Sequence, residues 1–319
     1  MDKKIPIIID CDPGHDDAMA ILWAIASPQL DLKAVTTVAG NQTIEKVTGN
    51  AIKVLTKLHR LDIPVAIGAE KPLLRKLVVG GEVVHGSSGL EGPNLPDPGF
   101  EPSELRALDL LIKTIEESDE KVTLVPIGPL TNIAALFIAR PDLREKISRL
   151  SIMGGGAYMG NWTPAAEYNI WADPEAAKIV FNFGIPIIMS GLDVTHKAYI
   201  TREENEILRA QGNEISVFAA ELIDYFSKYH YEVEGFPGCT MHDPTAIAAL
   251  LYPEMFTGVV CNVDVEIAGD LTTGMTVVDT IGYKEKIFGE KVDKNVTVLL
   301  DVDREKYVKA FFEAMKTLN

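Results

Sequence analysis

Four aspartates lie within eight residues near the start of the chain, in the segment DCDPGHDD at residues 10–17. Aspartates often begin a helix, whose first turn carries partial positive charge, and this explains one or two of the four. Four close carboxylates repel one another unless a cation compensates their charge. Their hard oxygens suit Ca²⁺ or Mg²⁺ better than zinc, although the EF-hand pattern is absent. The segment therefore leaves two alternatives, helix capping and a metal site.

A histidine precedes an aspartate in the motif His242-Asp243-Pro244, after a loop rich in glycine and proline. Asp-Pro is typical of a helix start, with aspartate as the N-cap and proline at the first helical position. Asp173-Pro174 has the same dipeptide with no neighbour that indicates chemistry. His242 makes the difference, because imidazole is the side chain most easily poised as a proton donor near neutral pH. Both interpretations, a cap and a catalytic site, stay open at this point.

A third candidate is Glu167-Tyr168-Asn169, which follows a loop that contains the run Gly154-Gly155-Gly156 and Asn161. The glycines could indicate a phosphate cradle, but the GxxxxGK[ST] pattern and a nearby basic residue are both missing. Acid and amide side chains suit the hydroxyls of a sugar better than a phosphate.

Alternating strands and helices position these candidates. Strands are predicted at residues 5–9, 32–38, 64–67, 122–127, 150–153, 185–189 and 263–267. Helices are predicted at residues 16–26, 44–58, 105–115, 131–139 and 304–318. This alternation predicts an α/β fold with a mainly parallel sheet flanked by helices, in one domain over residues 1–319. Ligands of such sheets bind beyond the carboxyl ends of the strands, where loops 79–100, 154–166 and 232–240 are rich in Gly, Pro and Asn.

The composition limits the possible partners. The chain has 319 residues and a net charge of −16, which disfavours nucleic-acid polymers and anionic membranes. The apolar run at the N-terminus is too short for a secretory signal, and no run reaches the length of a membrane span. Three scattered cysteines indicate no disulfide framework. We expect a soluble, cytoplasmic protein, and the charge leaves a neutral small molecule or a cation as possible partners.

The ordered motifs together resemble the inosine/uridine-preferring nucleoside hydrolase family. The resemblance begins with the aspartate-rich segment DCDPGHDDAMAI and covers almost the whole chain. Further matching motifs are VAGN at residues 38–41, HG at 85–86, GPLTN at 128–132, AEYN at 166–169, HDP at 242–244 and LTTGMT at 271–276. The resemblance implies the Rossmann-like open sheet of that family and hydrolysis of the bond between ribose and nucleobase.

The resemblance also implies roles for single residues. A calcium ion would be held by Asp12, Asp17, Asp243 and the backbone carbonyl of Ile127. Asp12 would accept a proton from the attacking water, and His242 would protonate or hydrogen-bond the departing base. The residues that would bind substrate are Asp16, Asn41, His85, Asn161, Glu167 and Asn169. Cleavage of an N-ribosyl bond builds positive charge on the sugar, which an acidic pocket stabilises.

Other points stay open. The base preference, purine or pyrimidine, is not set by these motifs, and Tyr229, His230 and Tyr231 have no assigned role. The family forms dimers or tetramers, so we expect a homo-oligomer. The rival enzyme class, aspartate-nucleophile phosphotransferases, also places Asp-x-Asp after a first strand, but Pro-Gly-His is not its usual continuation. A calcium-dependent nucleoside- or sugar-binding protein is the non-catalytic alternative, and an acid–base pair across the bond argues against it.

Overall fold

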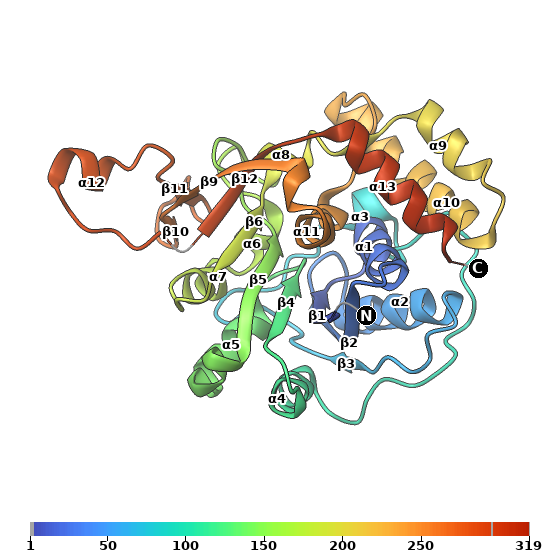
Figure 1. Cartoon of the computed structure of the whole chain (residues 1–319), viewed down its shortest axis with the longest axis horizontal. Coiled ribbons are helices and arrows are strands. Elements are labelled where there is room, and N and C mark those ends of the chain that lie inside the picture. Colours follow the sequence, from blue (N-terminus) through green and yellow to red (C-terminus); the bar gives the residue numbers. More distant parts are fainter. Residues whose placement is uncertain (1–2, 295, 319) are drawn as a thin grey trace.

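The computed structural model describes residues 3–294 and 296–318. Its centre is an eight-stranded sheet in the order β3-β2-β1-β4-β5-β6-β12-β9, in which only the β12–β9 pair is antiparallel (Figure 1). The strands are β1 (Ile5–Cys11), β2 (Leu30–Thr37), β3 (Val65–Ile67), β4 (Val122–Pro126), β5 (Ile147–Met153), β6 (Ile187–Ser190), β9 (Phe256–Cys261) and β12 (Val296–Val302). The α/β fold with a mainly parallel sheet is therefore confirmed.

Helices cover both faces of this sheet (Figure 1). One face packs against α1 (His15–Ala26), α2 (Ile44–Lys57), α10 (Glu214–Tyr229), α11 (His242–Leu251) and α13 (Arg304–Lys316). The other face packs against α4 (Ala107–Glu117), α5 (Thr131–Ala139) and α7 (Pro174–Phe181). Successive side chains of a strand point to opposite faces, so Ile7 and Ile9 enter the first core while Ile8 enters the second. Burial on both faces explains why β1 reads as a continuous apolar run.

Short elements connect the main ones and border the site. The short helices are α3 (Glu82–His85), α6 (Tyr168–Ala172), α8 (Leu192–Thr195) and α9 (Arg202–Arg209). Three further turns are η1 (Pro141–Lys146), η2 (His230–Glu234) and η3 (Pro253–Met255), and β7 (Tyr199–Ile200) pairs with β8 (Cys239–Thr240). Within the described part of the chain, no helix is both long and apolar enough to cross a membrane.

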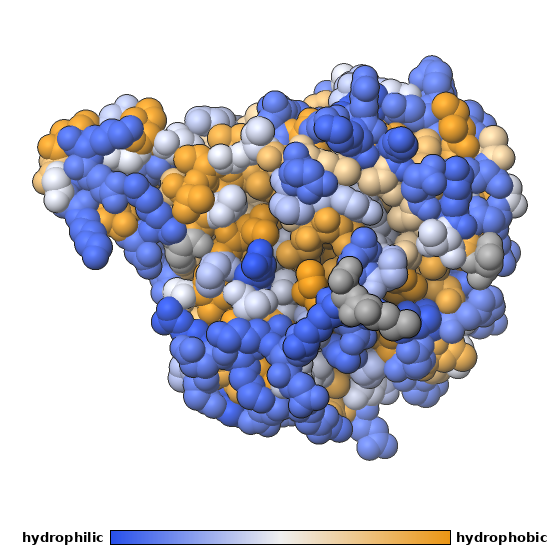
Figure 2. Space-filling model, viewed as in Figure 1, coloured by the Kyte–Doolittle hydropathy of each residue, from blue (hydrophilic) through white to orange (hydrophobic). Residues whose placement is uncertain are grey.

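The C-terminal part of the sheet departs from the sequence-based expectation. The strand predicted at 263–267 is the shorter β10 (Val263–Val265), which pairs with β11 (Thr276–Val278) outside the main sheet. β12 and β9 complete the main sheet and were missed. An arm that contains α12 (Tyr283–Phe288) extends beside this small ladder, and Figure 2 shows apolar residues gathered at its end. Half of each side chain or more is exposed there for Ile281, Tyr283, Ile287 and Phe288.

Candidate active site

The aspartate-rich segment lies at the carboxyl end of β1, where the chain turns into α1. Asp12 is buried, and its Oδ2 accepts a hydrogen bond of 2.7 Å from the backbone N–H of Asn41, which follows β2. Glycine is required on both sides of this carboxylate, because a Cβ on Gly40 or Gly128 would overlap one of its oxygens. Three parallel strands, β1, β2 and β4, thus bring their carboxyl ends together around Asp12, as expected for such sheets.

Asp17 closes the same turn from within the helix. Its Oδ1 accepts from the backbone N–H of Asp12 at 3.1 Å, and its Oδ2 accepts from that of Gly14 at 2.9 Å. The side chain therefore caps the first turn of α1, as the helix-capping interpretation requires. Capping uses Asp17 alone, so it leaves the burial of Asp12 and Asp16 unexplained.

Asp243 comes from the distant helix α11 and faces α1. Carboxylate oxygens of Asp16, Asp17 and Asp243 lie within 4.8 Å of one another, and all three side chains are buried. The N-cap interpretation of Asp243 is wrong, since α11 begins at His242 and its cap position has no side-chain hydrogen bond. Asp173, by contrast, caps α7 by accepting from the backbone N–H of Ala176 at 3.1 Å. The two Asp-Pro dipeptides therefore have different roles. Asp173 caps its helix, whereas Asp243 does not cap α11 and its carboxylate is available to a ligand.

The cluster carries more negative charge than its surroundings neutralise. Burial, followed by repulsion from neighbouring carboxylates, raises the pKa of Asp12, Asp16 and Asp243 well above the usual range. Burial also raises the pKa of Asp17 to about 6. Oδ1 of Asp12 and Oδ1 of Asp16 are buried without a hydrogen-bond partner in the described structure, and no lysine or arginine there forms an ion pair with the cluster. Buried charges of one sign in this arrangement fit a bound cation.

Beside the cluster opens a pocket of about 390 Å³, which all the predicted substrate-binding residues line. Backbone N–H groups hold the carboxylate of Glu167 in place. It accepts hydrogen bonds of 2.9 Å from the backbone N–H of Gly155 and from that of Asn169. Burial raises the pKa of Glu167 to about 7. The side-chain amide of Asn169 donates to the carbonyl of Ile127 at 2.9 Å, and Oδ1 of Asn161 accepts from the N–H of Tyr168 at 3.0 Å. Carboxylates and amides thus concentrate beside the aspartate cluster.

Aromatic and imidazole side chains form the continuation of this pocket. The ring of His85 lies with its Nε2 3.9 Å from Oδ1 of Asp16, and its ring centroid lies 5.0 Å from that of Phe226. Tyr229 and His230 also line the pocket, whereas Tyr231 faces Arg202 on a different surface. Sequence patterns could not separate these three neighbours, because their directions depend on the π-turn η2 at the end of α10.

His242 sits in a hydrogen-bonded network that sequence analysis missed. Thr195 Oγ1 lies 2.9 Å from its Nδ1, and Thr240 Oγ1 lies 2.8 Å from its Nε2. Thr240 Oγ1 is also 2.5 Å from Nε2 of His230, and the ring of His196 lies 5.6 Å from that of His242. Burial, then the neighbouring histidines, lower the pKa of His242 well below its usual value, so its imidazole is neutral at rest. No signal in the sequence marks the two threonines, which come from α8 and β8.

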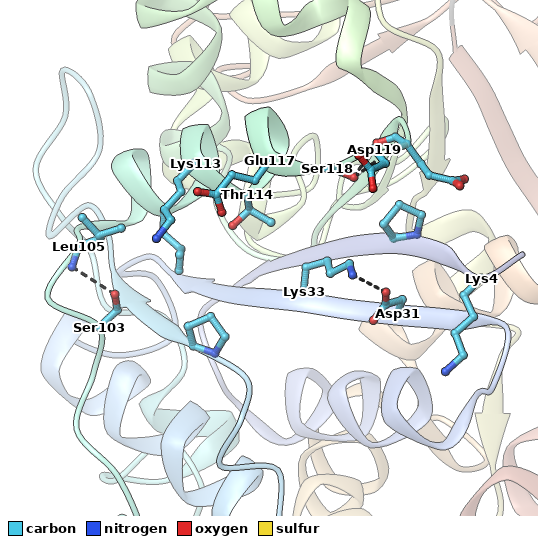
Figure 3. A pocket seen from close by; sticks show the side chains of 14 residues that line it. Lys4, Asp31, Lys33, Ser103, Leu105, Lys113, Thr114, Glu117, Ser118 and Asp119 are labelled. Carbon is cyan, nitrogen blue, oxygen red and sulfur yellow. Dashed lines mark hydrogen bonds and ion pairs between the residues drawn. The ribbon is translucent and has the colours of Figure 1, made fainter.

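A larger hollow, of about 710 Å³, lies at the opposite, amino end of the strands (Figure 3). Its charged side chains come in mixed signs, and Lys33 forms an ion pair with Asp31. Lys113 and Glu117 of α4 line another wall. Exposed charges of mixed sign are solvated and need no ligand, so the smaller pocket beside the buried carboxylates is the candidate active site.

Comparison with known proteins agrees with this geometry. The family model for inosine-uridine preferring nucleoside hydrolase matches residues 7–309. The chain is 53% identical over 313 residues to the pyrimidine-specific ribonucleoside hydrolase RihA of Escherichia coli O127:H6 (strain E2348/69 / EPEC), covering 98% of each chain. It superposes on the plant nucleoside hydrolase PpNRh1 with a TM-score of 0.90 and 34% identity, covering 98% of this chain and 99% of that one. For the purine-preferring ribonucleoside hydrolase of Gardnerella vaginalis, the TM-score is 0.89 at 29% identity, with 98% of both chains covered.

The family match spans nearly the whole chain, from β1 to α13, and so includes every element that contributes to the pocket. The solved relatives share its overall architecture over the same extent. The chain therefore belongs to the inosine-uridine preferring nucleoside hydrolase family and is a hydrolase that acts on N-glycosyl compounds.

Proposed function

We propose that the chain uses water and a bound Ca²⁺ to split pyrimidine ribonucleosides into ribose and free base. The observation that carries this proposal is the buried group of Asp16, Asp17 and Asp243, which opens onto a pocket lined by amides and carboxylates. Asp12 lies beside this group, and its backbone N–H donates to Asp17. Such a pocket fits the hydroxyls of a sugar and the positive charge that develops on it.

The donor set fits a hard cation. Asp12, Asp17, Asp243 and the carbonyl of Ile127 would hold it, and Asp16 offers a further oxygen within reach of Asp17 and Asp243. All of these donors are oxygens, which Ca²⁺ prefers. When bound, the cation would supply Lewis acidity that makes water a stronger nucleophile.

The side chains around the cation site accept the proton, bind the ribose and stabilise the developing charge. Asp12 accepts the proton that the attacking water loses, because its unpartnered Oδ1 is free to do so. Glu167, Asn169, Asn41 and Asn161 hold the ribose hydroxyls. The negative charge of the cluster stabilises the oxocarbenium-like transition state more than the neutral substrate.

His242 serves the departing base, with His85 on the same side of the pocket. Both ring nitrogens of His242 face threonine hydroxyls, so donation to a base replaces one of these two hydrogen bonds. A hydrogen bond or proton given to the base lowers the barrier, since the base is otherwise a poor anionic leaving group.

We infer the pyrimidine preference from the relative that is 53% identical to this chain, because the name of that protein states this specificity. The test is release of free ribose from uridine, cytidine, inosine and adenosine, measured side by side in the presence of Ca²⁺. We expect the highest kcat/KM for ribose release from a pyrimidine nucleoside. Binding of a nucleoside without ribose release would show a binding protein instead, and preference for inosine would overturn the pyrimidine assignment. A homo-oligomer and a cytoplasmic location stay predictions. The molar mass in solution, measured by light scattering, tests the first of them.

A further inference from the structure

One carboxyl group in the pocket is not used by the proposed chemistry. Glu234 ends the turn η2, after α10, and lines the pocket. A chain of contacts separates it from the aspartate cluster: His85 lies beside Asp16, Phe226 stacks on His85, His230 packs on Phe226 at 4.4 Å, and Glu234 follows His230. Glu234 therefore lies on the wall that would face the nucleobase once the ribose sits beside the aspartates.

The carboxyl of Glu234 lacks a partner. Its Oε2 is buried and has no hydrogen-bond partner in the described structure. The nearest imidazole nitrogen, Nε2 of His230, is 3.8 Å away and already lies 2.5 Å from the hydroxyl of Thr240. The side chain is only 22% exposed, and burial raises its pKa to about 7. A buried acceptor without a donor costs free energy, which a donor on the ligand would recover.

Among the other side chains at this end, Tyr229 and His230 carry polar atoms, and Nδ1 of His230 is also buried without a partner in the described structure. Phe226 and Val83 are apolar, and Glu82 of α3 is an exposed surface side chain. Among the described residues of this wall, Glu234 is thus the carboxylate that is partly buried, and an ionised carboxylate accepts a hydrogen bond more strongly than a neutral imidazole.

We propose that Glu234 is a specificity-determining residue, whose carboxylate accepts a hydrogen bond from the exocyclic amine of the nucleobase and so favours cytidine over uridine. The inference rests on the proposed function. Cytosine presents an amine donor at C4, and uracil presents a carbonyl acceptor at the same position. A carboxylate accepts from the amine and repels the carbonyl, so the two substrates differ in the sign of the interaction at this one position.

The test compares kcat/KM for cytidine and uridine at pH 8, where the carboxylate is ionised, in the wild type and in Glu234→Gln. Glutamine keeps the shape but offers a donor as well as an acceptor. The cytidine-to-uridine ratio should fall roughly ten- to a hundredfold, the range expected for one hydrogen bond to a charged group. Glu232→Gln is the matched control, because Glu232 lies exposed on the same turn and does not line the pocket, and its ratio should stay within about twofold of the wild type.

A third substrate, 4-nitrophenyl riboside, has no nucleobase and reports the ribose chemistry alone. Glu234→Gln should change its kcat/KM far less than that for cytidine, because the nitrophenyl group has no amine from which the carboxylate could accept. An unchanged or increased cytidine-to-uridine ratio overturns the inference, and so does an equal loss on all three substrates, which would show a merely structural role. If the wild type releases ribose from neither nucleoside, it is the proposed function that fails.

Discussion

Removal of divalent cations should destabilise the protein, and the structure sets the scale of the effect. Asp17 is buried, and its pKa rises from 3.8 to about 6 without a cation. About 2 pKa units at ~1.4 kcal/mol each amount to about 3 kcal/mol that the cation-free fold loses by keeping this one carboxylate ionised. The pKa values of Asp12, Asp16 and Asp243 shift in the same direction, so ionisation of these carboxylates also destabilises the cation-free fold.

The pH dependence follows from the sign of that shift. Because the folded pKa of Asp17 lies above its unfolded value, its contribution to stability is fully present below pH about 4 and is lost as pH rises through about 6. Without a cation the fold favours protonated carboxyl groups, and a bound cation favours the ionised carboxylates instead. The stabilisation by Ca²⁺ should therefore be small at pH 4 and on the order of 3 kcal/mol at pH 7.

The assay is thermal and urea unfolding in chelator and in millimolar Ca²⁺, each at pH 4 and pH 7. For 319 residues, 3 kcal/mol corresponds to a rise in Tm of about 4–5 °C. Asp243→Asn should shrink the response to Ca²⁺. Asp173→Asn is the matched control, since Asp173 is a buried helix cap outside the cluster and its variant should respond like the wild type. Identical unfolding curves with and without Ca²⁺ at pH 7 would refute the reasoning.

Three substitutions test the remaining assignments. Asp12→Asn should reduce kcat severely even at saturating Ca²⁺, because it removes a ligand charge and the proton acceptor; near-normal kcat contradicts this. His242→Ala should slow uridine hydrolysis by roughly 10²–10⁴-fold and largely spare 4-nitrophenyl riboside, whose leaving group needs no proton; equal losses on the two substrates exclude the acid role. Gly128→Ala should lower kcat with the far-UV circular dichroism retained, because its Cβ overlaps Asp12, whereas Gly49→Ala, in open space on α2, should leave kcat unchanged.

Local sequence patterns were enough for the elements that carry strong periodicity. The apolar run of β1 and the stretch that forms α1 predicted the first strand–helix unit to within a few residues. β12 was missed and β10 was assigned to the main sheet, because short apolar runs look alike whether or not they find a neighbour in the large sheet. Pairing partners far apart in the chain decide that outcome.

The sequence by itself determined the chemistry available: four aspartates at the end of a strand, a histidine beside a fifth, and a family resemblance that runs along the chain. Only the tertiary structure decided which carboxylates meet, since Asp243 reaches Asp16 and Asp17 from a helix more than two hundred residues later. It also decided that Asp173, in the same dipeptide, remains a cap. The physical reason is that side-chain direction at a helix start depends on where the helix begins, and that position is set by packing against distant elements and not by the dipeptide.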